Sequence, residues 1–557
     1  MDARKTDRGK AVIVQLRRAL AAVAVAFATT GGDSAAQTTH AELVDFYDAW
    51  RAFEMPAFEG GVPDYTQRAM DRQHGELEGW IDRLYAMNVD GWPIAQQIDW
   101  HLIRAEMNGL DFDHRVRRPW ARDPAFYATV FMAESDVPAH EGMSVHGFVD
   151  TWKYDYPLSA GDAAEITEKI GAIPGLLEQA RGNLDDSNAR DLWLAGDRSF
   201  GGQARDLEAY GRQVAGMSRE LDASISAAAD ASESFRTWLE AEAPSKTGPS
   251  GVGEENYTWY MQNVHLVPYT WSDQVMIMRR ELARSHSSMR LEENRNRHLP
   301  ELPRIDNAKD YDDLLNMSVT RYMKFLRDEE VETLEPWMDA ALRAVNGSFS
   351  AAEPGEVRNF FLEVIYRSPD AFRPHMHHWI ELARMREDPH SSPIRAIPPL
   401  YNIFDARSEG LATGVEEMFM HLGLLEGQPR ARELTWVMLA QRSARALSGL
   451  RLHGGVYDME DAVANAMKWT PRGWLTEGEL VRFEQHLYLR QPGYGTSYVS
   501  GKVQIEELLA EYAMAEGDDF TVKRFFDAYY AEGVIPTVLA RWAMTGEKDP
   551  ILDLGRR

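Results

Sequence analysis

Apolar residues recur every three or four positions along nearly the whole chain after Thr38. This spacing matches the 3.6-residue turn of an α-helix, and it predicts amphipathic helices over 41–53, 65–87 and 92–110. The alternation that is typical of β-strands is rare, and no repeat of fixed period is present. We therefore expect an all-α fold, a large and mostly helical scaffold made from a single chain.

Glycine and proline clusters predict where these helices stop. A run of long helices is expected over 162–183, 185–200 and 201–243, interrupted at Pro174 and at the Gly201-Gly202 pair. The segment 245–253 is rich in serine, glycine and proline and predicts a loop. It separates an N-terminal helical region, 37–244, from a C-terminal helical region, 254–557. Two more irregular segments are expected at 297–310 and 388–399.

The start of the chain predicts a secretory signal peptide over residues 1–36. A basic lead that includes Arg17 and Arg18 precedes the apolar run 19–28, and Ser34-Ala35-Ala36 offers a small-x-small cleavage site. The apolar run is too short to span a bilayer as a helix, and no later stretch is long enough. We expect a periplasmic or secreted mature protein without an integral membrane segment.

Composition excludes several classes of function. The net charge is −27, whereas a nucleic-acid-binding protein needs a basic surface, so no nucleic-acid partner is expected. The 557-residue chain contains no cysteine, which excludes disulfides, thiolate catalysis and cysteine-ligated metals. Any metal must therefore be held by histidine and carboxylate side chains.

The stretch 407–418 is the first candidate for a site. On a helix, Glu409 and Glu416 stack two turns apart on one face, while Leu411 and Val415 lie on the opposite, apolar face. The two carboxylates therefore lie on the face of the helix that is not needed for apolar packing. A carboxylate at such a position is solvated, ion-paired or part of a site.

The densest group of candidate metal ligands lies at 373–381, where Pro374 suits the first turn of a helix. His377 and Glu381 are four residues apart, a spacing at which two helical side chains can hold one ion. Glu409, from a second helix, would supply a third ligand. The alternative is that these histidines bond to backbone groups or carboxylates without any metal.

Three further elements carry polar candidates. On a helix over 433–453, Arg442, Arg445 and His453 lie on one side and suit an anionic group or a surface ion-pair network. Tyr498, in a loop that enters a helix, is placed to donate a proton or bind an oxyanion. The segment 140–146 contains two histidines and a glutamate, but it lacks the helical spacing of a metal motif and is expected to be a loop.

Together these blocks resemble the bacterial domain-of-unknown-function family 885, whose helical and often secreted members are related to zinc peptidases. The resemblance rests on four blocks in the family's order and on residues 255–259. The blocks are Glu409-Gly410-Leu411-Ala412 with Glu416; Arg442, Arg445 and Leu452-His453; Pro492-Gly493, Ser497-Tyr498 and Gly501; and Phe525-Phe526-Asp527 with Gly533-Val534-Ile535-Pro536. It implies a zincin-related C-terminal half, with Tyr257 and Trp259 as candidate substrate contacts.

The chain departs from the family in its first metal segment. The family has HExxPGHH, whereas this chain has Asp370-Ala371-Phe372-Arg373-Pro374-His375-Met376-His377-His378. The first histidine ligand and the glutamate that would activate water are therefore missing. Hydrolysis by a zinc-bound water needs three ligands and a nearby base, so the peptidase activity of the family is not carried over.

Three functions follow from this pattern. The first is a rewired enzyme that performs lyase-type acid/base cleavage of a small, aromatic molecule, using Glu409, His378, His453 and Tyr498 for proton transfer and Arg442 and Arg445 for substrate binding. The second is a zinc-dependent hydrolase or peptidase whose metal is held by His377, Glu381 and Glu409. The third is an inactive binding protein. Zinc is the one cofactor that these functions would use. The expected partner is a small-molecule or peptide substrate. The sequence does not predict the oligomeric state.

Overall fold

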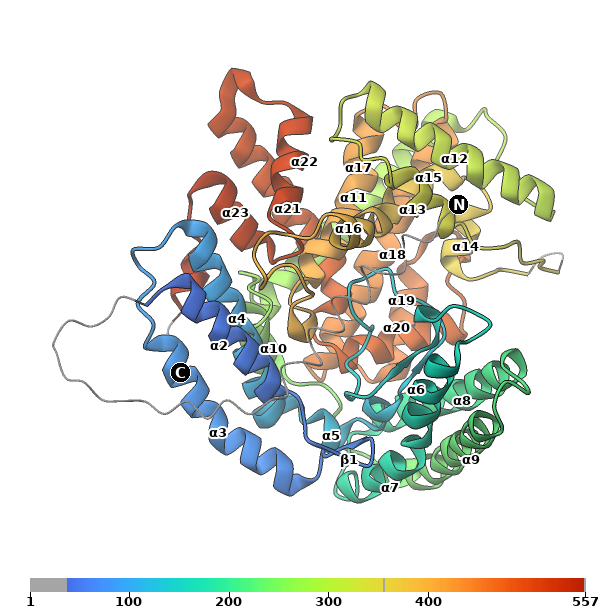
Figure 1. The fold of residues 1–557 in the computed structure, drawn as a ribbon. Helices are drawn as coiled ribbons and strands as arrows, with labels where there is room; N and C mark the ends of the chain where they lie inside the picture. Colours follow the sequence, from blue (N-terminus) through green and yellow to red (C-terminus); the bar gives the residue numbers. More distant parts are fainter. Residues whose placement is uncertain (1–37, 354–355, 555–557) are drawn as a thin grey trace. The chain divides into compact units, whose positions relative to one another are not determined.

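The computed structural model describes residues 38–353 and 356–554. The signal peptide predicted at 1–36 lies outside the described residues. From His40 onward the described chain forms one compact unit, and almost all of its regular structure is helical (Figure 1). The strands are two short pairs: β1 (Phe58–Glu59) with β2 (Val62–Pro63), antiparallel, and β3 (Val130–Phe131) with β4 (Val149–Asp150), parallel. The all-α prediction is confirmed.

The first eight α-helices that the structure describes lie before the loop that ends at Gly253. They are α2 (His40–Glu54), α3 (Gln67–Tyr85), α4 (Ile94–Phe112), α5 (Pro119–Arg122), α6 (Ala160–Gly171), α7 (Ile173–Asn183), α8 (Arg190–Gln213) and α9 (Arg219–Glu242). The helices predicted at 41–53, 65–87 and 92–110 correspond to α2, α3 and α4. The helices α6 to α9 pack around a core that includes Trp193, Phe200 and Phe235 and that also takes residues from α3, α5 and the β3–β4 pair.

The remaining α-helices follow that loop. They are α10 (Glu254–Asn263), α11 (Trp271–Asn296), α12 (Ala308–Asp328), α13 (Met338–Ala344), α14 (Phe360–Ile365), α15 (Pro369–Phe372), α16 (His377–Glu387), α17 (Asp405–His421), α18 (Pro429–His453), α19 (Met459–Trp469), α20 (Glu479–Arg490), α21 (Tyr494–Glu516), α22 (Val522–Ala531) and α23 (Thr537–Thr545). The irregular segments predicted at 245–253 and 388–399 are confirmed. The division into regions 37–244 and 254–557 stays a prediction.

Local sequence explains the boundary between α6 and α7 but not the course of α8 and α9, which are separated at residues 214–218 rather than at Gly201-Gly202. Pro174 stands in the first turn of α7 and separates it from α6, as expected. The predicted break at Gly201-Gly202 is wrong, because α8 runs through both glycines without interruption. A helical glycine costs only about 1 kcal/mol relative to alanine, and the buried Phe200 and Leu207 on the same helix offset that cost by packing.

The helices α17 and α21 cross in close contact. A Cβ atom on Gly501 would lie 1.9 Å from the carbonyl oxygen of Ala406, and one on Gly410 would lie 2.4 Å from the carbonyl carbon of Gly501. Only glycine permits so close an approach of two helix backbones. This contact brings the side chains that precede Gly501 on α21 within hydrogen-bonding distance of those on α17.

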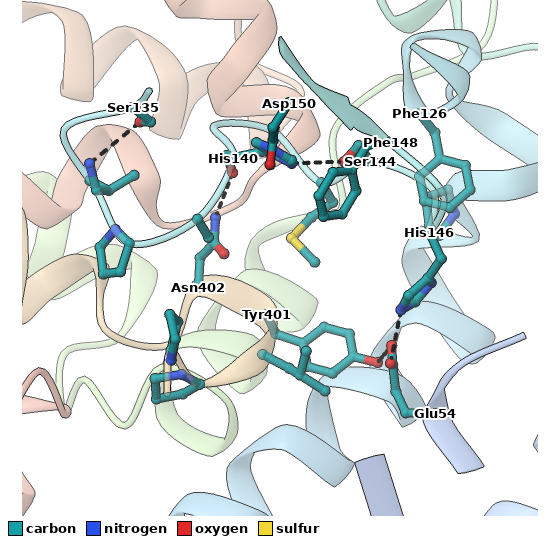
Figure 2. Close-up of a pocket in the computed structure, with 18 of the residues that line it drawn as sticks. Glu54, Phe126, Ser135, His140, Ser144, His146, Phe148, Asp150, Tyr401 and Asn402 are labelled. Atoms are coloured by element: carbon teal, nitrogen blue, oxygen red, sulfur yellow. Dashed lines mark hydrogen bonds and ion pairs between the residues drawn. The ribbon is translucent and has the colours of Figure 1, made fainter. Parts of the chain in front are cut away.

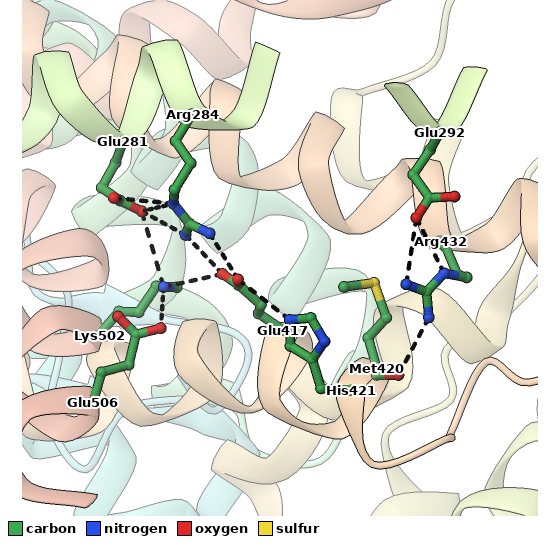
Figure 3. A network of polar contacts seen from close by, with 9 residues as sticks. All are labelled: Glu281, Arg284, Glu292, Glu417, Met420, His421, Arg432, Lys502 and Glu506. Atoms are coloured by element: carbon green, nitrogen blue, oxygen red, sulfur yellow. Dashed lines mark hydrogen bonds and ion pairs between the residues drawn. The ribbon is translucent and has the colours of Figure 1, made fainter. Parts of the chain in front are cut away.

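Buried ion pairs tie α17 and α21 to α11 (Figure 3). Arg284 of α11 donates to both carboxylate oxygens of Glu417 on α17, each at 2.7 Å. Lys502 of α21 lies 3.0 Å from the same carboxylate and pairs with Glu506 on its own helix. Lys502 is 1% exposed, so these carboxylates replace the water that would otherwise solvate its ammonium group. Three helices are thereby fixed relative to one another on the side of α17 that carries Glu417.

Among the residues that the structure describes, no helix combines the length and the apolar character that crossing a membrane requires.

Candidate functional site

A buried polar cluster surrounds Glu409 on α17. Its Oε2 atom lies 3.0 Å from Nε2 of His378 on α16, and its Oε1 atom accepts a 2.7 Å hydrogen bond from the hydroxyl of Tyr494 on α21. The hydroxyl of Tyr498, one helical turn further along α21, donates to that of Tyr494 at 3.2 Å. Glu409 and His378 are each 1% exposed. These four side chains, from three helices, form one continuous hydrogen-bonded chain.

Glu409 and His378 form an ion pair. Burial opposes ionisation of Glu409, but the adjacent His378 and the hydrogen bond from Tyr494 lower its pKa to about 2. Burial likewise opposes protonation of His378, but the carboxylate of Glu409 raises its pKa to about 9. At neutral pH Glu409 is therefore an anion and His378 a cation, as long as no further cation lies beside His378.

A second carboxyl group reaches the same tyrosine from a different part of the chain. Oε1 of Glu141 lies 3.1 Å from the hydroxyl of Tyr494. Burial, helped by the nearby charges of Asp136 and Glu409, raises the pKa of Glu141 to about 8. Tyr494 has a single proton, which it gives to Glu409, so a protonated Glu141 donates to the tyrosine oxygen. Two carboxyl groups with opposite protonation states thus meet at one hydroxyl.

His375 lies on the other side of His378, with ring centroids 5.2 Å apart. Its Nδ1 atom is 3.1 Å from Nη2 of Arg442 and 3.3 Å from Oε1 of Glu416. Arg442 forms a bidentate pair with Glu416 at 2.6 and 2.7 Å, and its side chain is fully buried. Burial and the charge of Arg442 lower the pKa of His375, so that histidine is neutral at pH 7.

Asp136, His375 and His378 offer ligand atoms that all lie within 4.8 Å of one another. Among the described residues this is the one group of three or more histidines and carboxylates with that geometry. Two imidazoles and a carboxylate form a donor set that catalytic zinc sites use. Each imidazole also contacts a glutamate, which is the arrangement that orients metal-binding histidines in proteins. The residues present therefore fit a divalent metal ion.

Asp136 and Glu141 belong to an irregular segment, 132–148, which covers the cluster. The segment is held by side chains of the C-terminal helices: the amide of Gly142 donates to Oε1 of Gln491 at 2.8 Å, and Arg490 donates to the carbonyl of Met143 at 3.1 Å. Gln491 in turn donates to the buried Asp405 at 2.5 Å. These bonds attach the covering segment to the end of α20 and the turn that follows it, just before Tyr494.

A cavity of about 520 Å³ lies on the other side of the covering segment. Figure 2 shows its lining, which includes His140, Ser144, His146 and Phe148 of the segment together with Tyr401 and Glu54. Glu409, His378 and Tyr494 do not line this cavity. The histidine and carboxylate ligand set and the shifted pKa values of Glu409, His378 and Glu141 belong to the buried cluster, and the cavity is a neighbouring space.

The structure brings several predicted residues together. Glu409, His378 and Tyr498 share the hydrogen-bonded chain, and Arg442 reaches it through His375. Arg445 pairs with Glu484, and its guanidinium lies 4.4 Å from the ring centroid of Tyr498. Tyr498 lies in the second turn of α21 and not, as predicted, in the loop that precedes this helix.

His453 is not brought to this cluster, contrary to prediction. Its Nε2 atom bonds to the carbonyl oxygen of Tyr488 at 2.8 Å, and its Nδ1 atom accepts from the amide of Val252 at 3.4 Å. Burial lowers its pKa to about 4. Both ring nitrogens therefore form hydrogen bonds with backbone groups. The position of His453 on the same side of the helix as Arg442 and Arg445 does not predict these bonds.

The two aromatic candidates on α10 also lie apart from Glu409. The hydroxyl of Tyr257 bonds to that of Thr496 at 3.0 Å, and its ring packs 5.1 Å from that of His453. Trp259 stacks on Phe112 at 5.8 Å. The described contacts of both residues are with the scaffold rather than with the cluster, so a role in substrate binding stays a prediction.

The predicted metal ligands His377, Glu381 and Glu409 do not converge. Nδ1 of His377 lies 3.2 Å from the hydroxyl of Tyr322, and its Nε2 atom faces Glu332 at 3.7 Å. Glu381 is paired with Arg407 at 2.7 Å. The spacing of four residues does place His377 and Glu381 on one face of α16, but that face packs against other helices. His378, next in sequence, is the residue that points to Glu409.

Sequence reasoning missed Asp136, Glu141 and His375. The segment 140–146 is a loop, as predicted, but its distance along the chain from α17 gave no reason to place Glu141 beside Tyr494. His375 was within the histidine-rich stretch that the sequence singled out. A three-residue step from His375 to His378 was the available signal, because it also places two side chains on one side of a helical turn.

The chain resembles bacterial proteins whose function is not known. A family model described as "Bacterial protein of unknown function (DUF885)" matches residues 377–544. The matched stretch includes His378, Glu409 and Tyr494, whereas His375 and Asp136 precede it. The comparison with curated proteins gave no match.

Two solved structures share the fold. One is described as a putative lipoprotein of unknown function from Shewanella oneidensis, with a TM-score of 0.65, 15% identity and coverage of 91% of this chain and 100% of that chain. The other is a putative lipoprotein from Colwellia psychrerythraea, with a TM-score of 0.63, 13% identity and coverage of 93% and 100%. This chain therefore shares its all-α fold with these two bacterial proteins. The part of the chain that resembles DUF885, residues 377–544, extends from the start of α16 into α23.

Proposed function

We propose that the buried cluster is the active centre of a metal-dependent hydrolase that acts on a small-molecule or peptide substrate. The observation that carries this proposal is the convergence of Asp136, His375 and His378, whose ligand atoms lie within 4.8 Å of one another. Zinc is the expected ion, since it favours two imidazoles and a carboxylate and this chain has no cysteine.

The surrounding residues have the properties that hydrolysis requires. When bound, the metal ion supplies a Lewis acid for carbonyl polarisation and water activation. Glu409 is ionised and accepts a proton, directly or through Tyr494. Glu141, which is protonated at neutral pH, donates one to a leaving group. The hydroxyls of Tyr494 and Tyr498 are neutral, and turning their protons away from Glu409 and from Tyr494, respectively, would direct them to a developing oxyanion.

A lyase that cleaves a small, aromatic molecule by acid/base catalysis is the second candidate. It is favoured by a separate observation: Glu409 and Glu141 contact the same tyrosine hydroxyl, while their environments move their pKa values in opposite directions. Paired groups of this kind often divide the roles of base and acid. This chemistry needs no activated water and no metal ion.

Metal analysis of the purified full chain distinguishes these functions. The hydrolase proposal predicts a stoichiometric metal ion in the wild type, and its loss in His375→Ala and in His378→Ala. His377→Ala is the matched control, because His377 is equally buried on the same helix but faces Tyr322 and Glu332. A folded His378→Ala variant that keeps its metal would refute the proposed ligand set.

Turnover then separates the remaining alternatives. A panel of peptides, small aromatic esters and other small aromatic molecules is assayed with and without a chelator. Hydrolysis that is lost with the metal and restored by zinc supports the hydrolase, whereas cleavage of an aromatic molecule without uptake of water, in a reaction that survives chelation, supports the lyase. Thermal stabilisation by a ligand that is never converted would indicate an inactive binding protein.

The leader sequence and the two solved structures of the same fold that are described as putative lipoproteins support a location outside the cytoplasm. We propose that the mature chain is periplasmic or secreted. A fusion of residues 1–36 to a reporter enzyme that is active only outside the cytoplasm tests this, and a reporter that stays inside the cell would contradict it.

A further inference from the structure

We propose that the cavity beside the covering segment binds an uncharged aromatic or apolar group of the substrate; calling its occupant the substrate rests on the proposed function. The cavity measures about 520 Å³, within the range of 300–1,000 Å³ that is usual for small-molecule sites. Its lining is mainly apolar and aromatic, and includes Tyr65, Trp120, Phe126, Met143, Phe148 and Tyr401.

The charges of the cavity lining indicate that the occupant is neutral. Every acidic side chain of the lining has a basic partner in the same lining: Glu54 with His146 at 3.2 Å, Asp113 with Arg117 at 2.6 Å, Glu134 with Arg386 at 3.0 Å and Asp150 with His140 at 2.7 Å. Lys153 also pairs with Asp150. A charged ligand would find no unpaired counter-charge here, and its desolvation would therefore be poorly compensated.

The backbone at Tyr401 gives independent support for a binding role. Tyr401 and Asn402 both have a positive φ, 58° and 50°, which is an unfavourable conformation for residues other than glycine. The ring of Tyr401 also requires a glycine beside it, because a Cβ on Gly109 would lie 2.4 Å from the ring. The ring of Tyr401 therefore reaches the cavity only with a strained backbone at 401–402 and with a glycine at position 109 (Figure 2). Strain of this kind is concentrated at functional sites.

The hydroxyl of Tyr401 provides a polar end to an otherwise apolar space. It lies 3.3 Å from Oε1 of Glu54, whose other oxygen pairs with His146. The hydroxyl of Tyr65 lies 2.7 Å from Nδ1 of His146. This group of hydrogen-bonded side chains suits a ligand with one hydroxyl or carbonyl at the edge of an aromatic ring.

The covering segment connects this cavity to the buried cluster. Val137 and His140 line the cavity, while Asp136 and Glu141, their neighbours in sequence, belong to the cluster. An apolar group held in the cavity therefore lies against the segment that carries one proposed metal ligand and one proposed proton donor. The rest of the substrate would reach the reacting groups past this segment.

Fluorescence of N-phenyl-1-naphthylamine, an uncharged aromatic probe that brightens in apolar surroundings, tests the cavity. Wild-type protein should bind it saturably, and Ala139→Phe and Ala396→Phe, which fill the cavity from two different segments, should each weaken binding by roughly tenfold or more. Ala223→Phe, on the exposed side of α9, is the control for an added phenyl group and should bind like the wild type.

Two further measurements keep the outcomes distinct. His378→Ala should lose metal but still bind the probe, so failure of the metal proposal does not decide the cavity proposal. Melting temperatures of both filled variants report whether they fold. Saturable binding that is unchanged in two folded, filled variants, or no saturable binding by the wild type, would overturn the assignment of this cavity.

Discussion

The hydroxyl of Tyr494 donates a hydrogen bond of 2.7 Å to the carboxylate of Glu409. The two residues lie 85 positions apart and on different helices, α21 and α17. They meet because the two backbones touch at Gly410 and Gly501, which allow an approach that no other residue would permit. Tyr494 thereby joins Glu409 to Glu141, and the helix crossing becomes the base of the candidate active site.

Replacing Tyr494 by phenylalanine tests this junction. Loss of the hydroxyl removes one donor from the reacting region and separates the two carboxyl groups, so kcat/KM should fall by roughly 10²- to 10³-fold with metal content unchanged. Tyr488→Phe is the matched control, since its buried hydroxyl has no hydrogen-bond partner among the described residues. Equal activity in the two variants would contradict a role for Tyr494 in turnover.

Glu416 is predicted to act through His375. In Glu416→Gln the charge behind the imidazole is lost, and zinc affinity, measured by competition with a chromophoric chelator, should fall about 10- to 100-fold. Glu484→Gln removes the partner of another buried arginine, Arg445, without touching a histidine of the ligand set. Both variants should melt at lower temperature, but only the first should bind zinc more weakly. Unchanged affinity in Glu416→Gln would exclude this positioning role.

Gly501→Ala should disrupt the helix crossing. The added methyl group would lie 1.9 Å from the carbonyl oxygen of Ala406, so α17 and α21 must separate, at a cost of about 3 kcal/mol. Gly202→Ala, on α8, is the control, because its Cβ would meet nothing within 4 Å and should stabilise the helix by about 0.5–1 kcal/mol. The free energy of unfolding in urea reports both. A Gly501→Ala protein as stable as the wild type would show that the close contact is dispensable.

The buried network at Glu417 predicts a specific pH dependence of stability. Burial opposes ionisation of Glu417, but Arg284 and Lys502 lower its pKa from 4.5 to about 2. A carboxyl group whose pKa is lower in the folded state stabilises that state above its unfolded pKa, and this contribution, about 3 kcal/mol, is lost as the pH falls from about 4.5 toward 2.

Glu417→Gln should therefore be less stable than the wild type at pH 7, and the difference in free energy of unfolding should shrink between pH 5 and pH 3. Urea denaturation at several pH values measures it. Glu511→Gln, which breaks a more exposed pair with Arg541, serves as the control and should differ little from the wild type at any pH. A difference that stays constant down to pH 3 would contradict the network's role.

Helical periodicity was sufficient to predict the fold class and the approximate bounds of α2, α3 and α4. Pro174 and the loop after α9 behaved as their local chemistry requires. Gly201 and Gly202 did not end α8, because packing of the residues around them outweighs a weak intrinsic preference. Helix propensity therefore predicts where a helix ends only where tertiary packing does not oppose it.

The site was predicted only in part. Glu409, His378 and Tyr498 do converge, but helical spacing could not decide between His377 and His378, because α17 and the start of α16 are buried all round and have no solvent face to orient them. Helical spacing also failed to predict the surroundings of His453, because its two ring nitrogens bond to backbone groups. Asp136 and Glu141 come from an irregular segment whose approach to α21 depends on bonds to Gln491 and Arg490, and no local pattern encodes such a long-range contact.

The central claim is that Asp136, His375 and His378 hold one metal ion. Crystals of the full chain grown with zinc and measured on both sides of the zinc absorption edge test it most directly. We predict an anomalous difference peak within coordination distance of these three side chains, with Glu409 beside His378. A fully occupied peak between His377 and Glu381, or no peak near His378 in crystals that contain zinc elsewhere, would contradict the account.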